Sequence, residues 1–363
     1  MSDHDFFVDP ELSRASTLPA VFYRDPAAHR AVIERIFARS WQFIGDVDRL
    51  KVPGQCLPFT LLEGSLDEPL LLTRDSNDTL HCISNVCTHR GALVCEGEKV
   101  QSSMRCRYHG RRFGLDGEFV SMPEFQGVEN FPTPSDNLPR VAFGQWHKFL
   151  FATLHAPTGF DDFTAPMDAR LSFLPFHELR FNAARSRDYL VNANWALYCD
   201  NYLEGFHIPY VHAALSEALD YGSYKVELFA GGTLQLGIAS GDEHVFQIPA
   251  DHPDHGLRVA AYYYWLFPNL MVNVYPWGIS VNVLKPLAAD RTRVSFLAYV
   301  WDEAKLDQGA GSGLDRVERE DEAVVESVQL GVRSGLYRAG RYSVAREDGV
   351  HHFHRMISSR LTK

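Results

Sequence analysis

The sequence lacks long basic runs, long apolar runs and internal repeats. No run of five basic residues occurs, and 46 Asp and Glu outweigh 35 Lys and Arg, giving a formal charge of −11 over 363 residues. This charge balance argues against nucleic acid as a partner. No apolar stretch reaches the roughly 18 residues of a membrane span, and the first residues lack the basic and then apolar pattern of a signal peptide. The composition therefore predicts a cytoplasmic protein with no membrane partner.

Cysteine is scarce and unevenly placed. The chain has 6 cysteines, of which Cys82, Cys87, Cys95 and Cys106 lie close together. So few cysteines in a chain of this length do not suit a disulfide framework, and their clustering favours metal or redox chemistry.

The length of the chain and the distribution of apolar and turn-forming residues along it predict about two domains of different kinds. Asp25 and Pro26 suit the start of a first helix, which is expected to reach about residue 40. Short apolar runs broken by Gly, Pro and Asp follow, and they indicate an all-β domain over 41–156. Residues 157–363 mix the two patterns, with 157–166 as the expected linker. Helices are expected over 189–205 and 314–336, and strands over 224–248 and 257–284.

The strongest motif pairs one cysteine with one histidine twice. Cys87-Thr88-His89 is followed, after sixteen residues, by Cys106-Arg107-Tyr108-His109. Two thiolates and two imidazoles suit a Rieske [2Fe–2S] centre, in which two histidines replace two cysteines on one iron. Cys87 and Cys106 are expected to bind the outer iron, and His89 and His109 the other. A Cys₂His₂ zinc site is the alternative, although its cysteines usually come as a pair before the histidines.

Glycines follow both ligand pairs. Gly91 and Gly110 would let backbone amides approach the cluster sulfides, because glycine has no side chain to block them.

A second candidate metal site lies in the second half of the chain. His207 and His212 are five residues apart, which places them about 140° out of line on an ideal helix. Pro209 between them predicts a break or kink that would swing the second histidine round. Surface or ordinary core histidines are the alternative. The upstream cluster favours the metal site, because a one-electron carrier needs an acceptor such as Fe(II) held by two histidines and one carboxylate.

Helical periodicity singles out the carboxylate. In the expected helix over 314–336, Asp321 falls within the apolar stripe, Glu318 at its edge, and Glu320 and Glu322 well off it. An aspartate on a core-facing stripe is costly unless it binds a metal or a charged partner. Asp321 is therefore the expected third ligand, with a salt bridge to a buried arginine as the alternative.

These motifs resemble those of the Rieske non-haem iron oxygenases. Residues 85–91 and 106–110 are similar to the family's cluster loops, and the extra cysteine pair of respiratory Rieske proteins is missing. The family also places its third iron ligand in a Glu-Asp pair shortly before a Gln-x-Gly stretch, which 329–331 matches. The resemblance implies an α+β chain with an N-terminal Rieske domain and a C-terminal helix-grip domain, an antiparallel sheet with helices over one face. Residues 1–40 would pack on the catalytic domain.

The resemblance also implies roles for two further carboxylates. Glu204 matches the residue that links an iron-ligand histidine to a cluster histidine of the neighbouring subunit, here His207 and His109. Most family members have Asp at this position, and Glu resembles the carnitine monooxygenase branch. Asp200 matches a polar residue close to iron in relatives.

The expected function is that of a terminal oxygenase with one [2Fe–2S] cluster and one mononuclear Fe(II) per subunit. It would use O₂ to hydroxylate a small organic substrate within a homotrimer. The chain has neither a Gly-rich dinucleotide fingerprint nor a plant-type cluster motif, so a separate flavin and iron–sulfur reductase, dependent on NAD(P)H, would supply electrons.

The substrate is less closely defined. Residues 201–210 and 267–270 resemble choline, glycine betaine and carnitine monooxygenases, and aromatic side chains could form a cage for a quaternary ammonium group. The candidates are Tyr202, Phe206, Tyr210 and Phe267, together with Tyr262, Tyr264 and Tyr275. Hydroxylation or C–N cleavage of such a compound is the first hypothesis. An aromatic-ring dioxygenase or O-demethylase is the alternative, and a Rieske electron carrier without catalysis is a more distant one.

A third histidine cluster is expected to have no metal role. His351, His352 and His354 are read as residues of an extended strand, where neighbours point to opposite faces.

Overall fold

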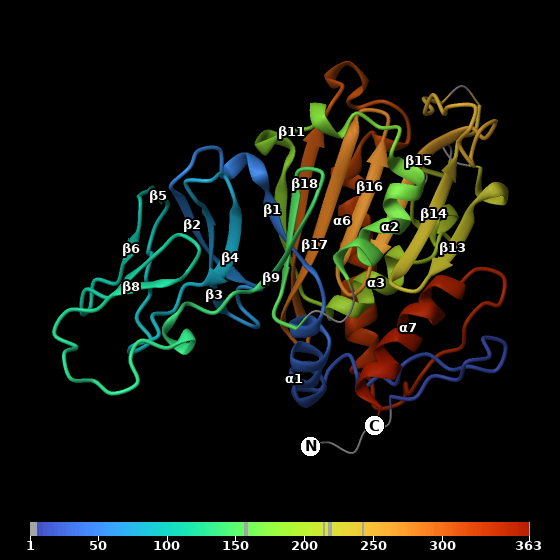
Figure 1. Ribbon diagram of the computed structural model, residues 1–363. Coiled ribbons are helices and arrows are strands. Elements are labelled where there is room, and N and C mark those ends of the chain that lie inside the picture. Colours follow the sequence, from blue (N-terminus) through green and yellow to red (C-terminus); the bar gives the residue numbers. More distant parts are fainter. Residues whose placement is uncertain (1–5, 156–158, 213–214, 217–219, 242, 363) are drawn as a thin grey trace. The chain divides into compact units, whose positions relative to one another are not determined.

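A computed structural model describes residues 6–155, 159–212, 215–216, 220–241 and 243–362 (Figure 1). The chain divides into two compact units. The small unit is residues 38–157, and the large unit combines residues 1–37 with 158–363. In the described part of the chain, no helix has both the length and the apolar character needed to cross a membrane.

The small unit consists of short antiparallel strands in three sheets. The first has the order β1-β10-β9, the second β4-β3-β2-β5 and the third β6-β7-β8. Their bounds are β1 (Gln42–Asp46), β2 (Gln55–Leu61), β3 (Glu68–Arg74), β4 (Leu80–Ser84), β5 (Lys99–Val100), β6 (Met104–Arg105), β7 (Arg112–Phe113), β8 (Phe119–Ser121), β9 (Ala142–Trp146) and β10 (Phe149–Thr153). The all-β prediction for this part of the chain is confirmed.

Cysteines form part of the core of the small unit. Cys87 and Cys106 pack in one buried cluster with Leu71, Ile83 and Phe113. All six cysteines of the chain are free thiols.

The first helix, α1 (Pro26–Arg35), begins where the sequence predicts. The Asp25 carboxylate accepts a hydrogen bond from the Ala27 amide at 2.9 Å, and Pro26 occupies a first-turn position that needs no donor. The segment is part of the large unit, where the Phe37 and Trp195 rings lie 4.9 Å apart.

The large unit is built on one eight-stranded antiparallel sheet. Its order is β11-β18-β17-β16-β15-β14-β13, with β12 also paired to β18. The bounds are β11 (Arg180–Phe181), β12 (Arg187–Val191), β13 (Lys225–Phe229), β14 (Gly232–Ile238), β15 (Val259–Leu266), β16 (Leu270–Tyr275), β17 (Gly278–Ala288) and β18 (Arg291–Val300). Its helices are α2 (Phe160–Leu171), α3 (Trp195–Tyr202), α4 (Ile208–Val211), α6 (Leu314–Val332) and α7 (Asp348–Leu361). The α+β prediction is confirmed.

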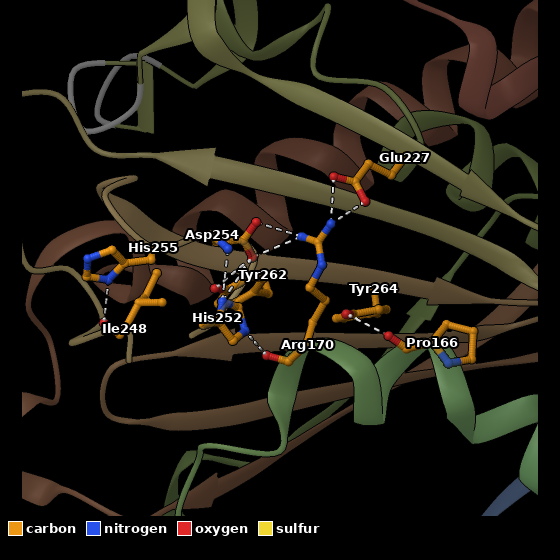
Figure 2. Close-up of polar contacts among 9 residues, drawn as sticks. All are labelled: Pro166, Arg170, Glu227, Ile248, His252, Asp254, His255, Tyr262 and Tyr264. Carbon is orange, nitrogen blue, oxygen red and sulfur yellow. Dashed lines mark hydrogen bonds and ion pairs between the residues drawn. The ribbon is translucent and has the colours of Figure 1, made fainter. Parts of the chain in front are cut away.

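Helix α2 covers one face of this sheet. The Tyr264 hydroxyl donates to the Pro166 carbonyl at 3.2 Å, and Arg170 pairs at 2.8 Å with both Asp254 and Glu227 (Figure 2). The expected linker over 157–166 is therefore wrong from Phe160 onward, because α2 buries an apolar stripe that includes Met167.

Helices α3, α6 and α7 lie on the opposite face. The Trp265 ring of β15 lies 5.0 Å from Phe353 of α7, on the side away from Tyr264. The sheet thus has helices on both faces rather than on one. The expected helix over 189–205 is partly wrong, since Arg187–Val191 pairs with β18 before α3 begins. The long helix is confirmed, although it ends at Val332.

Candidate metal centres and active-site cavity

The two cluster loops of the small unit share one backbone design. The Gly91 amide donates to the Cys87 carbonyl at 2.9 Å, and the Gly110 amide donates to the Cys106 carbonyl at 3.0 Å. Gly91 has φ +77° and Gly110 φ +78°. Residues with side chains disfavour this conformation, so both turns require glycine.

Four donor side chains project from these loops. The Nδ1 atoms of His89 and His109 face each other at 3.1 Å, and the thiols of Cys87 and Cys106 are buried in the core. Burial and then the neighbouring His109 lower the pKa of His89, which favours the neutral imidazole that a metal requires. Two thiols and two imidazoles, one of each per loop, fit a Rieske cluster.

The orientation of this donor set corrects one expectation. Cys87 and Cys106 are only 3% and 2% exposed, whereas His109 is exposed. The cysteine side is therefore the inner one, and the expectation of an outer cysteine-bound iron is wrong. The apolar strands around the thiols account for this arrangement.

Asp136 connects the two ligand loops and was not singled out by its sequence. Its backbone carbonyl accepts a hydrogen bond from the Thr88 hydroxyl at 2.8 Å, and its carboxylate pairs with buried Arg111 at 2.5 Å. The Arg111 guanidinium lies 5.0 Å from the centre of the Phe119 ring. No short motif could reveal this contact, because it depends on the return of a distant segment.

In the large unit, His207 and His212 flank the single turn α4. The chain leaves helix α3 at Tyr202, and the two imidazole rings lie 5.1 Å apart. The predicted break is present, but it precedes His207. Pro209 lies in the first turn of α4, where its missing amide costs no helical hydrogen bond.

Helix α6 brings Asp321 to these histidines. Asp321 Oδ1 lies 2.9 Å from His212 Nε2 and 3.5 Å from His207 Nε2. One donor atom from each residue lies within 4.8 Å of the others. Two imidazoles and one carboxylate are the donor set of a non-haem Fe(II) site with open positions.

The other ring nitrogen of each histidine contacts a carboxylate. His207 Nδ1 lies 2.7 Å from Glu204 Oε1, and His212 Nδ1 lies 2.8 Å from Glu320 Oε2. Carboxylates at these positions orient the rings and leave Nε2 free for a metal. Glu320 was excluded as an iron ligand in the sequence analysis because its position on the helix points it away from the apolar stripe. Helical position gives the direction of a side chain, but it does not show that another segment brings His212 beside it.

The charge on His212 reflects this arrangement. Burial alone would lower the pKa of His212, but the hydrogen bonds to Asp321 and Glu320 raise it above its usual value. The same two carboxylates that raise this pKa lie on either side of the ring, so that each ring nitrogen of His212 faces a carboxylate oxygen.

Glu204 uses both carboxylate oxygens within its own chain. Oε1 faces His207, while Oε2 accepts hydrogen bonds from the Phe206 and His207 amides. These bonds fix the carboxylate against the imidazole.

Asp200 lies in a different network. Its carboxylate oxygens contact His354 Nε2 at 2.8 Å and the Tyr23 hydroxyl at 3.0 Å, while His354 Nδ1 lies 2.6 Å from the Tyr342 hydroxyl. The neighbouring Asn201 lines the iron-site cavity, whereas Asp200 faces the N-terminal segment and α7.

The third histidine cluster is helical rather than extended. His351, His352 and His354 lie in α7, where His351 contacts the Asp9 carbonyl at 2.7 Å and His352 the Phe229 carbonyl at 2.9 Å. The strand expectation is wrong, because every third or fourth residue of α7 is apolar and buried.

A cavity opens beside His207, His212 and Asp321. It is lined by polar, aromatic and aliphatic side chains of α3, α6, the sheet and the segments that join them, among them Tyr198, Asn201, Tyr202, Glu204, Tyr224, Gln235, Tyr263, Asn273, Tyr275, Ser280, Asn282, Phe296, Leu314, Val317 and Glu318. The cavity lining thus combines several aromatic rings with amide, carboxyl and aliphatic groups.

The aromatic candidates divide between inside and outside. Tyr202 lines the cavity, as does Tyr275. Phe206 and Tyr210 are 41% and 82% exposed outside it, and Phe267 packs against Trp265 and Arg360.

Strand alternation explains part of this division. Tyr262 and Tyr264 point to the α2 face, where Figure 2 shows them beside Asp254 and Pro166, and Tyr263 between them points into the cavity. Tyr263 was missed by the sequence analysis. It pairs across the sheet with Asn273, which lies two residues before Tyr275 on β16, so Tyr263 and Tyr275 share a face.

Two family comparisons together span most of the chain. Residues 40–132 match the Rieske [2Fe-2S] domain, and residues 176–363 match the catalytic domain of the ring hydroxylating alpha subunit. The chain belongs to the Rieske ring-hydroxylating oxygenase alpha subunits. The family carries a Rieske [2Fe–2S] cluster and a mononuclear iron, which the two donor sets fit.

Individual relatives of this Rieske oxygenase are monooxygenases. The chain is 30% identical over 371 residues to choline monooxygenase of Arabidopsis thaliana, covering 97% of this chain and 85% of that protein. It is 29% identical over 370 residues to the carnitine monooxygenase oxygenase subunit of Escherichia coli K12, covering 98% and 96%.

Solved structures share the fold of this oxygenase. A quaternary ammonium Rieske monooxygenase superposes with a TM-score of 0.76 at 24% identity, covering 97% of each chain. A naphthalene 1,2-dioxygenase gives a TM-score of 0.70 at 16% identity, covering 96% of this chain and 92% of the other.

Proposed function

We propose that this Rieske oxygenase component uses O₂ to oxidise a small quaternary ammonium compound, by hydroxylation or C–N cleavage. The observation that carries the proposal is the convergence of His207, His212 and Asp321 beside a cavity that several aromatic rings line. Aromatic rings attract quaternary ammonium groups through their π faces. The similarity to choline and carnitine monooxygenases supports the same substrate class.

The residues have separate tasks in this proposal. His207, His212 and Asp321 would hold the mononuclear iron, and Cys87, His89, Cys106 and His109 would hold the cluster. When bound, the iron would supply O₂ activation and the cluster single electrons. Glu204 and Glu320 orient the two imidazoles. Each carboxylate accepts a hydrogen bond from Nδ1, which fixes the tautomer and the orientation of the ring.

Glu204 has a second task in electron transfer. We propose that it bridges His207 to His109 of a neighbouring copy in a homotrimer. Its fixed hydrogen bonds to His207 support one half of that bridge. Inter-subunit electron transfer is described for the solved quaternary ammonium monooxygenase, which supports the other half by similarity.

The proposal divides the chain by task. Residues 41–156 receive electrons from a separate NAD(P)H-dependent reductase, and 157–363 carry out the oxidation with 1–40 packed against them. The isolated bridge between Ser16 and Arg341 supports the last assignment. Asp200 would then act from outside the cavity, through its hydrogen bonds with His354 and Tyr23.

A substrate panel tests the proposal. The protein, loaded with both metal centres and coupled to a Rieske oxygenase reductase with NAD(P)H, is given choline, glycine betaine, carnitine and simple aromatics. At least one quaternary ammonium compound should stimulate O₂ consumption with matching product. Stimulation by aromatics alone would overturn the proposal and favour an aromatic-ring oxygenase.

A further inference from the structure

The cavity beside the iron ligands contains one carboxyl group with no assigned task. Glu318 lies on α6 one turn before Asp321, and Leu314, Val317, Glu318 and Asp321 line the cavity together. The spacing of these four residues places them on one face of the helix. Glu318 therefore faces the same cavity as the iron ligands.

Several other polar groups of the lining satisfy one another. The Tyr202 hydroxyl donates to Asn273 Oδ1 at 2.6 Å, and the Tyr224 hydroxyl donates to Gln235 Oε1 at 3.1 Å. The remaining lining carboxylates, Glu204 and Asp321, contact the two histidines of the iron site. These groups therefore have partners before any substrate enters.

Glu318 differs from them. In the described part of the chain it has neither a hydrogen-bond nor an ion-pair partner. Arg187 is the cation that lowers the pKa of Glu318, but it does not pair with it. Its guanidinium donates instead to the Ala184 and Ser186 carbonyls at 2.6 and 2.8 Å. An unpaired carboxyl group in a cavity wall is costly unless a ligand supplies its partner.

The surroundings of Glu318 indicate the charge of that partner. Burial, and then the negative charges of Asp315, Glu322 and Asp321, raise the pKa of Glu318 to about 9, with Arg187 opposing them. At neutral pH this pKa leaves the Glu318 side chain protonated while the cavity is empty. A cation entering the cavity would lower the pKa of Glu318 and favour its carboxylate form, whereas an anion would raise the pKa further. Phe296 and Tyr275 offer aromatic faces in the same lining.

We infer that Glu318 is the acidic group that ionises beside the cationic head of the substrate, recognises it and selects it against neutral molecules of the same shape. The inference rests on the proposed function and adds a specificity-determining residue to it. The aromatic rings make apolar contact with a trimethylammonium group and with a tert-butyl group, and they add a modest cation–π attraction for the first. The carboxylate distinguishes the two, because only the first carries a charge.

Matched pairs of probes test this role by binding rather than by turnover. Choline is compared with 3,3-dimethylbutan-1-ol, and glycine betaine with 3,3-dimethylbutanoate, because each pair differs in replacing nitrogen by carbon. Calorimetric titration of the metal-loaded protein under anaerobic conditions gives four dissociation constants. In the wild type at least one cation should bind on the order of tenfold more tightly than its neutral-headed partner.

Three variants give the test its controls. Glu318→Gln keeps the shape of the side chain and should reduce the preference several-fold, to the part that cation–π attraction alone supplies, by weakening only the binding of the cation. Glu318→Asp keeps the charge and should retain part of the preference. Glu326→Gln removes an equal charge from the same helix, outside the cavity lining, and should leave the preference unchanged. Iron content and the cluster spectrum establish that each variant is folded.

The outcomes separate this inference from the proposed function. If Glu318→Gln keeps the wild-type preference, the inference is overturned, whereas oxidation of a quaternary ammonium compound in the substrate panel would still support the function. Equal wild-type binding of both members of each pair overturns the inference as well. A panel with no active quaternary ammonium compound overturns the function itself.

Discussion

The two metal centres of this chain are built in different ways. The cluster ligands come from two short loops of one unit, where each glycine turn returns to its cysteine carbonyl. The iron ligands come from α4 and α6, with His212 and Asp321 separated by 109 positions. A local turn determines its ligand geometry by backbone constraints, while a site between elements depends on how those elements pack.

The difference extends to the residues that support the ligands. In the large unit two carboxylates, Glu204 and Glu320, contact the ligand histidines directly. In the small unit Asp136 holds the loops through Thr88 and Arg111, and none of its hydrogen bonds within the described part of the chain involves a ligand side chain. Loss of Glu320 should therefore reduce the metal affinity of the iron site, whereas loss of the Asp136 contacts should reduce the folding stability of the small unit.

Loss of a cluster ligand should have the largest effect. Cys106→Ala or His89→Ala should abolish the visible absorption and the paramagnetic signal of the reduced Rieske centre, because each removes one of four donors. Absorption and electron paramagnetic resonance spectra of purified protein provide the measurement. A metal analysis that finds zinc and no iron would end the Rieske assignment.

Loss of an iron ligand should leave the cluster intact. Asp321→Ala or His207→Ala should remove about one iron per chain and all oxygenation, since the two donor sets share no residue. Iron analysis and the Rieske spectrum of the same sample test this independence. Loss of iron in Glu320→Ala but not in Asp321→Ala would show that the ligand and its supporting carboxylate have been exchanged.

The Glu204 bridge should affect transfer without affecting metal content. Glu204→Gln should keep both metal centres and normal reduction of the cluster, yet product formation in a single turnover should collapse. Wild-type electron delivery in this variant would exclude a bridging role.

The same bridge can be tested by mixing subunits. Mixed oligomers of His109→Ala and His207→Ala chains should regain activity if electrons cross between copies. Verified mixed oligomers without activity would favour transfer within one chain.

Removal of a supporting carboxylate should have an intermediate effect. Glu320→Gln should weaken iron binding by about 10- to 100-fold, because His212 loses the acceptor that orients its ring. Competition with a chelator measures this affinity. Arg316→Gln is the matched control: its ion pair with Glu320 is exposed at 73% on the arginine side, so its loss should have little effect.

The smallest effect is expected where one neutral hydrogen bond joins the cluster loops. Thr88→Val should lower the free energy of unfolding by about 1 kcal/mol, while the ligands stay in place. Denaturant titration followed by cluster absorption measures it. Thr60→Val, at an exposed position of β2, is the control, and an equal loss there would show that the Asp136 contact adds nothing.

Expectations from the sequence succeeded where a residue's role is local. The cap of α1 by Asp25 and the phase of Asp321 on α6 both follow from neighbours within a few residues. They were less successful where a short segment could take two conformations. The strand at 187–191 and helix α2 were misassigned, because pairing with β18 and packing on the sheet determined their structure.

The sequence by itself determined the two donor sets, the α+β class and the family resemblance, because ligand type, spacing and hydrophobic period are local properties. Only the tertiary structure decided which side chains share a space. It placed Glu320 on His212, Asp136 between the cluster loops, and Tyr263 rather than Tyr262 in the cavity. It also left Glu318 facing that cavity without a partner. These contacts join segments far apart in the chain, and their geometry depends on how sheet and helices pack rather than on any motif.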